Sequence, residues 1–475
     1  MTDFSKANSM GEESISRLLW RFSLPATVAM AVTASYNAVD AAFVGRLGSE
    51  AIAALSVAFP AQMVFGALAI GTGVGAASLI SRSLGAGKPE EARATVGQVV
   101  LLSLGFGILL TIVGRFFLEP MLLLFGATPE ILPFCAEYMS VITDGALLLF
   151  LSFMLAHTIR AEGNAIFPMA VLITSSVVNI ILDPIFIFVL KMEIRGAAIA
   201  TILAKVVNIA CYLWYYLSGR SALKISLRHL RPCSNIILEI YKIGLPTILI
   251  QISFNTSLIV ANRILGSFGH IPIAVMGMVM RLQQFATMPV IGLNHGLLPI
   301  IGFNFGANKF TRIRDAVIKG LSVGIIFGTV AGLAFFLFPG LFLRIFTDEK
   351  MLLQEGAIAL RIMVLMYPLI GVPLISGALF QGIGKGSPAL LLALLRQFLL
   401  YIPLILLLLR PFGLTGIWVA APLADFLTFL IALTMVSSEL KRQGIPLYNG
   451  TPFFRRNRLS CRCASSPAQR HGEGD

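Results

Sequence analysis

The segment 19–46 reads LWRFSLPATVAMAVTASYNAVDAAFVGR. It is longer than the ~20 apolar residues that a helix needs to cross the hydrocarbon core of a bilayer. Its single carboxylate, Asp40, lies within the apolar stretch. Stretches of the same kind, separated by short polar connections, recur along the whole chain. We therefore expect the segment to be the first of several membrane-spanning helices.

The composition agrees with a membrane protein. Of the 475 residues, 57% are hydrophobic and only 12% are charged, whereas about a quarter of the residues of a soluble domain are charged. No removable signal peptide is expected, because residues 1–18 are polar and the apolar segment after them is too long for the hydrophobic region of a signal peptide.

We predict an all-α polytopic membrane protein with twelve transmembrane helices. Their expected ranges are 19–46, 51–81, 94–117, 133–158, 166–190, 196–218, 238–264, 271–303, 316–339, 357–381, 388–410 and 414–438.

The distribution of basic residues predicts the orientation. If residues 1–18 lie in the cytoplasm, 23 Lys and Arg residues fall in cytoplasmic segments and 7 in external loops. This asymmetry follows the positive-inside rule, so we expect a bacterial inner-membrane protein with both termini in the cytoplasm. The net charge of +13 is then loop charge that orients helices, and no nucleic-acid partner is expected. The basic tail 441–475 is expected to be disordered.

The two halves of the chain resemble each other at an offset of 221 residues. The matched positions include the following pairs: Leu24-Pro25 and Leu245-Pro246, Gly45 and Gly266, Gly48 and Gly269, Gln62 and Gln283, Gly71 and Gly292, Gly75 and Gly296, and Gly85-Ala86-x-Lys88 and Gly306-Ala307-x-Lys309. Such a repeat predicts an N-lobe (19–220) and a C-lobe (238–440), joined by a cytoplasmic loop (221–237). Six helices per lobe in the same orientation imply a pseudo-two-fold axis along the membrane normal, and duplicated transporters bind substrate between the repeats.

Three segments resemble the multidrug and toxic compound extrusion family. They are Pro25 with Tyr36–Gly48, then Arg160–Asn164 leading to Asn179–Pro184, then Pro289–Ala307. The similarity extends over roughly residues 15–440. It implies an antiporter that expels amphipathic, often cationic, drugs in exchange for protons or sodium ions. The sequence is most similar to the bacterial branch with an Asp cluster in the N-lobe, because Ala261 stands at the position equivalent to Asp40 in the second half.

Asp40 is the first candidate coupling residue, since a charged Asp at a helix centre costs ~2.5–3.5 kcal/mol on insertion scales. The resemblance places Asp40, Asn179, Asp183 and Thr201 together as an ion-coupling site. Two carboxylates held close together out of water favour binding of a proton, while Asn and Thr oxygens would complete a sodium shell. Two alternatives remain open: a structural hydrogen-bond network, and neutralisation of Asp183 by Lys205.

Tyr36, Asn37 and Tyr138 are the candidate drug-binding residues, although Tyr138 equally suits an interfacial anchor. Pro25 removes a backbone hydrogen bond and is either a hinge or a tolerated kink. In the C-lobe, Arg396 is expected to snorkel or pair with backbone carbonyls, and Asp425 is expected to be structural.

No metal site, cofactor or enzymatic constellation is predicted, and the lack of a Walker motif argues against ATP as the energy source. The expected partners are small-molecule drugs and the lipid bilayer, with a monomer as the expected assembly. The alternative function is a flippase for lipid-linked precursors from the same broad superfamily. Such flippases tend to line their cavity with basic residues, whereas acids lie in this N-lobe.

Overall fold

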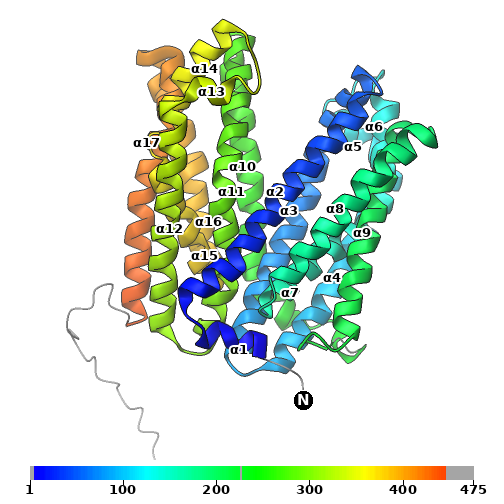
Figure 1. The fold of residues 1–475 in the computed structure, drawn as a ribbon, viewed down its shortest axis with the longest axis vertical. Coiled ribbons are helices and arrows are strands. Elements are labelled where there is room, and N and C mark those ends of the chain that lie inside the picture. Colours follow the sequence, from blue (N-terminus) through cyan, green and yellow to red (C-terminus); the bar gives the residue numbers. More distant parts are fainter. Residues whose placement is uncertain (1–4, 225–226, 445–475) are drawn as a thin grey trace, which may run out of the picture.

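The computed structural model describes residues 5–224 and 227–444, which form helices with no strand among them. The helices form two bundles that lie side by side (Figure 1). The expected disorder of the tail concerns residues that lie almost entirely outside this range.

A short helix precedes the first bundle, α1 (Ser5–Glu12). The N-lobe comprises α2 (Ile15–Gly45), α3 (Ser49–Gly85), α4 (Pro89–Phe116), α5 (Leu118–Leu124), α6 (Leu132–Asp144), α7 (Ala146–Ala161), α8 (Ile166–Pro184), the π-helical segment η1 (Ile185–Val189) and α9 (Glu193–Leu217). The short turn η2 (Leu227–Leu230) connects the lobes. The C-lobe comprises α10 (Ser234–Gly266), α11 (His270–Gly306), α12 (Phe310–Leu337), α13 (Pro339–Leu343), α14 (Lys350–Met363), α15 (Tyr367–Gly382), α16 (Gly386–Leu394), the π-helical segment η3 (Leu395–Tyr401) and α17 (Ile402–Arg442).

Twelve spans follow from these helices. Within the described residues, nine helices are long and apolar enough to cross a membrane, and two bent pairs, α6 with α7 (55°) and α14 with α15 (54°), add two more. The last of the nine covers 57 residues, Gly386–Arg442, which at 1.5 Å per residue would be about 86 Å long. It breaks at Gly413 (φ 54°, ψ −134°), so it supplies two spans. The predicted all-α fold with twelve spans in two lobes is confirmed.

The duplication is visible in the element lengths. Helices α3 and α11 both have 37 residues, and α4 and α12 both have 28. Each lobe then has a bent helix pair followed by a helix with a π-helical segment. The turns before α3 and α11 use the matched Gly48 and Gly269 at φ 124° and 104°, a region that residues with a Cβ rarely adopt.

Two pairs of helices form the interface between the lobes. Helix α3 of the N-lobe packs on α10 of the C-lobe, and α11 of the C-lobe packs on α2 of the N-lobe. Small residues permit this close approach. A Cβ added at Gly75 would lie 2.2 Å from Ile240 O, and one at Gly292 would lie 2.1 Å from Thr27 Oγ1. These contacts lie toward the end of the molecule that holds α1, which we call the closed end; toward the other end the two bundles diverge (Figure 1).

The tightest approach at the closed end involves the matched glycines Gly85 and Gly306. A Cβ at Gly85 would lie 1.9 Å from Phe303 O, and one at Gly306 would lie 2.0 Å from Arg82 O. Each repeat therefore places its own glycine against the backbone of the other repeat. Polar contacts join the lobes in the same region, including a hydrogen bond of 2.5 Å from Ser78 Oγ to Gln381 O.

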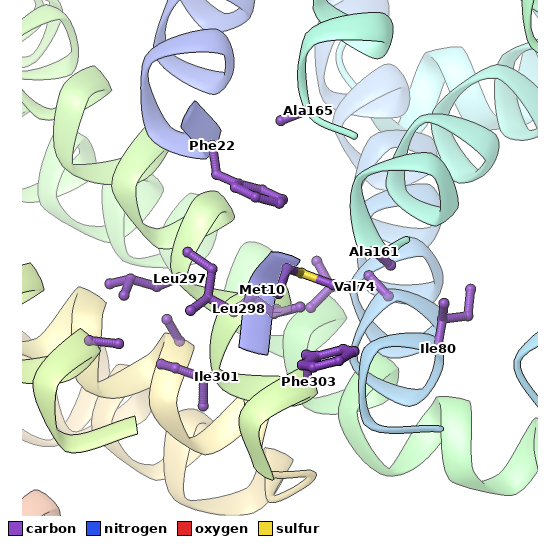
Figure 2. Packing of buried hydrophobic residues seen from close by; sticks show 14 of the residues in the cluster. Met10, Phe22, Val74, Ile80, Ala161, Ala165, Leu297, Leu298, Ile301 and Phe303 are labelled. Carbon is purple, nitrogen blue, oxygen red and sulfur yellow. The ribbon is translucent and has the colours of Figure 1, made fainter. Parts of the chain in front are cut away.

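Helix α1 packs beneath this junction, although residues 1–18 were predicted only as a polar segment. Met10 is fully buried among side chains of both lobes, with Val74 of α3 and Leu298 of α11 nearby (Figure 2). Asn304 Nδ2 and Arg312 Nη2 donate hydrogen bonds to Met10 O at 3.0 and 3.2 Å. These donors satisfy a carbonyl near the end of a short helix, where intrahelical partners are lacking.

Candidate transport site

Asp40 lies near the C-terminal end of α2, a half-buried position. Its Oδ1 atom is buried and accepts no hydrogen bond from any described residue. Tyr36, one helical turn earlier, is also half-buried, while Asn37 is exposed. Residues three and four apart share a helix face, so Tyr36 and Asn37 flank Asp40 on the N-terminal side.

Asn179 and Asp183 form a buried pair near the C-terminal end of α8. Asn179 Nδ2 donates to Asp183 Oδ1 at 3.1 Å, and the two side chains are 2% and 0% exposed. The second oxygen of each group, Asn179 Oδ1 and Asp183 Oδ2, is buried without a partner among the described residues. A buried acceptor left unsatisfied costs about 1–3 kcal/mol, so this pair has unused capacity to bind a proton or a cation.

The backbone beside Asp183 departs from the regular α-helix. Pro184 follows directly and has no backbone N–H to donate. The chain then continues as the π-helical segment η1, with Leu190 N bonded to Ile185 O at 2.8 Å. Single π-helical turns inside helices are frequent at functional sites, and here one adjoins the carboxylate.

Tyr138, on α6, is an electrostatic neighbour of both acids. It is 4% exposed and is an electrostatic neighbour of Asp40, Tyr36 and Asp183. Its burial among these groups does not suit the alternative interpretation as an interfacial anchor. The Tyr138 hydroxyl also interacts with the side chain of Gln62 on α3. Gln62 was not among the predicted site residues, although it matches Gln283 in the repeat.

Lys205 does not pair with either acid. Its Nζ lies 5.8 Å from the ring centroid of Tyr36 and 5.6 Å from that of Phe153, and it makes no ion pair within 4.0 Å with any described carboxylate. Aromatic rings attract an ammonium group over their faces. Thr201, one turn before Lys205 on α9, is half-buried and makes no hydrogen bond with a described residue, so the geometry does not connect it to Asn179 and Asp183.

Pro25 is buried within α2, which is a continuous helix from Ile15 to Gly45. It lies on the part of α2 that packs against α11 at the closed end, close to Thr27 and Ser23, whose atoms face Gly292 and Gly296. Contacts with the C-lobe therefore lie on both sides of Pro25, at Ser23 and at Thr27, and Asp40 lies further along the same helix.

The C-lobe lacks the acid pair. Ala261, the counterpart of Asp40, is 1% exposed and packs in an apolar cluster with Leu265 and Val279. Arg396 was expected to snorkel or to pair with carbonyls; instead its Nε donates to Asp425 Oδ1 at 2.5 Å. Among the described residues, no group of three or more His, Cys, Asp or Glu side chains is arranged to hold a metal ion.

The chain matches the MatE family model twice, over residues 25–185 and 246–407, which is one match for each lobe. The multidrug export protein MepA of Staphylococcus aureus is 29% identical over 423 residues, covering 88% of this chain and 93% of that protein. MepA of Staphylococcus haemolyticus is 27% identical over 433 residues, covering 91% and 95%.

Solved structures agree with the fold. A MATE crystal structure in a bent conformation has a TM-score of 0.88 at 25% identity, and one in a straight conformation has 0.87 at 26%, each covering 92% of this chain and 98% of the other. A MOP superfamily transporter from Pyrococcus furiosus has a TM-score of 0.87 at 25% identity with the same coverage. Two matches to the family model in register with two six-helix lobes place this chain in the MatE family of multidrug export transporters.

Proposed function

We propose that this protein is a secondary-active antiporter that exports amphipathic, often cationic, compounds in exchange for protons. The site that couples the two flows is the acid cluster of the N-lobe. Asp40, Asn179 and Asp183 bind the ion, with Thr201 as a fourth candidate ligand that approaches when the site is occupied. Both termini lie in the cytoplasm of a bacterial cell, and the transporter works as a monomer.

One observation supports the proposal most strongly. Three oxygens from two helices, Asp40 Oδ1, Asn179 Oδ1 and Asp183 Oδ2, are buried without hydrogen-bond partners among the described residues. Acids within transmembrane helices are rare and mark ion pathways or proton relays. A structural network would instead be expected to satisfy its members, because a partly satisfied buried network is costly.

The proton is favoured over sodium as the coupling ion. A proton needs only one carboxylate oxygen, and the site offers two carboxylates that are electrostatic neighbours. Sodium needs several oxygens at once, and Thr201 is not joined to the Asn179–Asp183 pair by a hydrogen bond. Sodium remains the alternative because Asn179 Oδ1 is available as a neutral ligand.

The drug would bind beside the same acids. Tyr36 and Asn37 precede Asp40 by one helical turn, and Tyr138 is an electrostatic neighbour of Asp40 and Tyr36. A cationic amine bound at Asp40 would gain both the carboxylate charge and the aromatic faces. A proton that neutralises Asp40 removes that attraction, so drug and proton compete for the site. Competition of this kind is sufficient to couple drug export to proton entry.

Pro25 would convert the change at Asp40 into movement. Helix α2 contacts the C-lobe at Ser23 and Thr27, on either side of Pro25, and bears Asp40 further along. Proline leaves a carbonyl without its helical donor and so permits the helix to bend between these contacts and Asp40. A MATE transporter similar to this chain has been solved in bent and straight conformations, which agrees with a helix that changes shape.

A lipid-linked precursor flippase is the second candidate. Recognition of a phosphorylated headgroup needs a basic lining. Near the two acids, the described residues place Lys205 over the ring of Tyr36 but no cluster of basic side chains. The acid cluster therefore favours the drug antiporter.

The test is efflux of a fluorescent amphipathic cation from everted vesicles at a fixed membrane potential. Proton and sodium gradients are imposed separately. Export driven by the pH gradient alone is expected. Export that survives collapse of the pH gradient but stops without sodium would overturn the proton assignment, and the absence of export under either gradient would overturn the antiporter.

A further inference from the structure

A groove lies between α12 and α17 on the surface of the C-lobe, and we call it the α12–α17 groove. Helix α12 begins and α17 ends at the closed end of the molecule (Figure 1), and α15 packs against both helices. The groove has a volume of about 280 Å³. Its walls include Val317, Ile318 and Leu321 of α12 and Leu433 and Val436 of α17.

The α12–α17 groove opens toward lipid. Ile318 and Leu433 are exposed at its rim, and the same faces of the two helices continue away from the closed end with the exposed Ile325 and Leu430. Exposed apolar side chains of this kind on transmembrane helices contact lipid tails, which are as apolar as leucine. A hydrocarbon chain is therefore the natural occupant of the recess.

The two hydroxyl groups in the lining need no polar partner. Thr434 Oγ1 donates a hydrogen bond to Ile431 O at 2.8 Å, and Ser437 Oγ donates one to Thr434 O at 3.0 Å. Both bonds stay within α17. Because these donors are satisfied by their own helix, an acyl chain can fill the groove without leaving a polar group unsatisfied.

Positive charge lies at the closed end of the groove. Lys441 follows Ser437 by four residues, so it continues the groove face of α17 by one turn. The Cα–Cβ bond in a helix tilts toward the helix N-terminus, which directs Lys441 back toward the groove. Lys441 and Arg442 are exposed in the last turn of α17. The Lys441 side chain makes no hydrogen bond or ion pair with another residue in the described part of the chain.

Neighbouring acids do not neutralise Lys441. Glu439, the nearest acid along α17, already accepts a hydrogen bond from Lys385 Nζ at 2.6 Å. On α12, Arg314 lies one turn before the groove, and its Nη2 donates to Asp315 Oδ1 at 3.1 Å. Each of these acids therefore has a basic partner of its own, and the charge of Lys441 is available to an anion.

We propose that the α12–α17 groove and Lys441 form a binding site for a phospholipid with an anionic headgroup. One acyl chain lies in the groove, and the headgroup phosphate lies beside Lys441, with Arg442 as a second donor. Ser437 and Lys441 are about 6 Å apart along the helix axis, which leaves room for the glycerol ester that joins phosphate and chain. Basic residues at the cytoplasmic ends of transmembrane helices attract anionic lipids. The inference goes beyond drug export and uses only the proposed cytoplasmic position of the closed end.

Charge complementarity favours this occupant over two others. The chain segment after Gly444 is itself basic, with Arg455, Arg456 and Arg458. A second copy of the protein that packed through the same face would place Lys441 against Lys441, because two-fold symmetric interfaces use the same patch on both subunits. Both alternatives bring like charges together, whereas a phosphate neutralises the lysine.

The experiment measures which lipid stays bound to the full-length transporter. The protein is purified from vesicles that contain equal amounts of phosphatidylglycerol and phosphatidylcholine with identical acyl chains, and native mass spectrometry identifies the retained lipids. The wild type is expected to retain one phosphatidylglycerol in preference to phosphatidylcholine. Equal retention of the two lipids, or a two-chain complex without lipid, would overturn the proposal.

Lys441→Gln tests the contact with the headgroup. It is expected to lower the ratio of retained phosphatidylglycerol to phosphatidylcholine about fivefold, the factor that one basic residue at a membrane surface supplies. The control, Lys88→Gln, removes an exposed lysine at the closed end of the N-lobe and should leave the ratio unchanged. A ratio that responds equally to both substitutions, or to neither, would exclude a headgroup site at Lys441.

Leu321→Trp tests the groove itself. The larger side chain fills the recess and leaves every charge in place, so retention of phosphatidylglycerol should fall severalfold. Leu333→Trp places the same ring at an exposed position further along α12 and should have no effect; equal retention in these two variants would show that no acyl chain occupies the groove. If Leu321→Trp does not fold, Lys441→Gln still decides, because its side chain is exposed. The assay contains neither drug nor ion gradient, so its outcome is independent of the antiporter proposal.

Discussion

Replacing Gly85 or Gly306 with alanine should open the closed end of the transporter. The added methyl group would lie 1.9 Å from Phe303 O or 2.0 Å from Arg82 O, whereas real Cβ atoms essentially never approach closer than 3.0 Å. The obstructing atoms belong to the backbone of the other lobe, so no side-chain rotation can relieve the contact. The lobes must separate by about 1 Å, and overpacking of this kind costs about 1–3 kcal/mol.

That cost applies only to the conformation in which the lobes meet. Alanine also favours a helix over glycine by about 1 kcal/mol, but this gain is equal in all conformations with α3 and α11 intact. The ratio of open to closed molecules at this end should therefore rise roughly 5- to 150-fold per substitution.

The measurement is the distance between spin labels at Lys88→Cys and Thr311→Cys, in a background in which the five native cysteines are replaced. Both positions are exposed and flank the closed end, one in each lobe. Gly66→Ala in α3 and Gly277→Ala in α11 are the matched controls, because a Cβ at either meets nothing within 4 Å. Distance distributions of Gly85→Ala and Gly306→Ala that match those of the two controls would refute the reasoning.

Three other outcomes are expected. Asp40→Asn should reduce drug export to background with normal expression, because it removes the carboxylate for which drug and proton compete in the proposed mechanism. The exposed Glu50→Gln should export normally, and normal export by Asp40→Asn would make Asp40 structural. Met10 is fully buried, and truncating such a side chain typically costs about 2–5 kcal/mol, so Met10→Ala should lengthen the distance between the same two spin labels. The exposed Asn8→Ala should leave that distance unchanged. Equal distances in the two variants would show that α1 does not stabilise the closed end. A reporter fused after Gly444 should be active as a cytoplasmic fusion, and periplasmic activity there would invert the topology.

The sequence by itself determined the fold class and most of the helix boundaries. Apolar length decides whether a segment crosses a bilayer, and that property needs no knowledge of its neighbours. The range predicted as 271–303 is observed as His270–Gly306, and 166–190 as Ile166–Val189. The repeat also gave the two lobes, because matched Gly and Pro positions survive in both halves.

The sequence was less informative about α1, where a short polar helix has no apolar stretch to reveal it. Its largest buried side chain, Met10, packs against residues of both lobes, and the sequence alone does not show that these lobes surround it. The same limit applied to Gln62, which looked like an isolated polar residue until α6 brought Tyr138 to it.

Only the tertiary structure decided how the polar residues combine. Asn179 and Asp183 are four residues apart on one helix, so the sequence could pair them. In contrast, Arg396 and Asp425 lie on different helices, and their hydrogen bond depends on how η3 and α17 pack. It likewise decided that Gly85 faces Phe303 of the other lobe, since a glycine in a sequence shows that a close approach is possible but not which backbone approaches it.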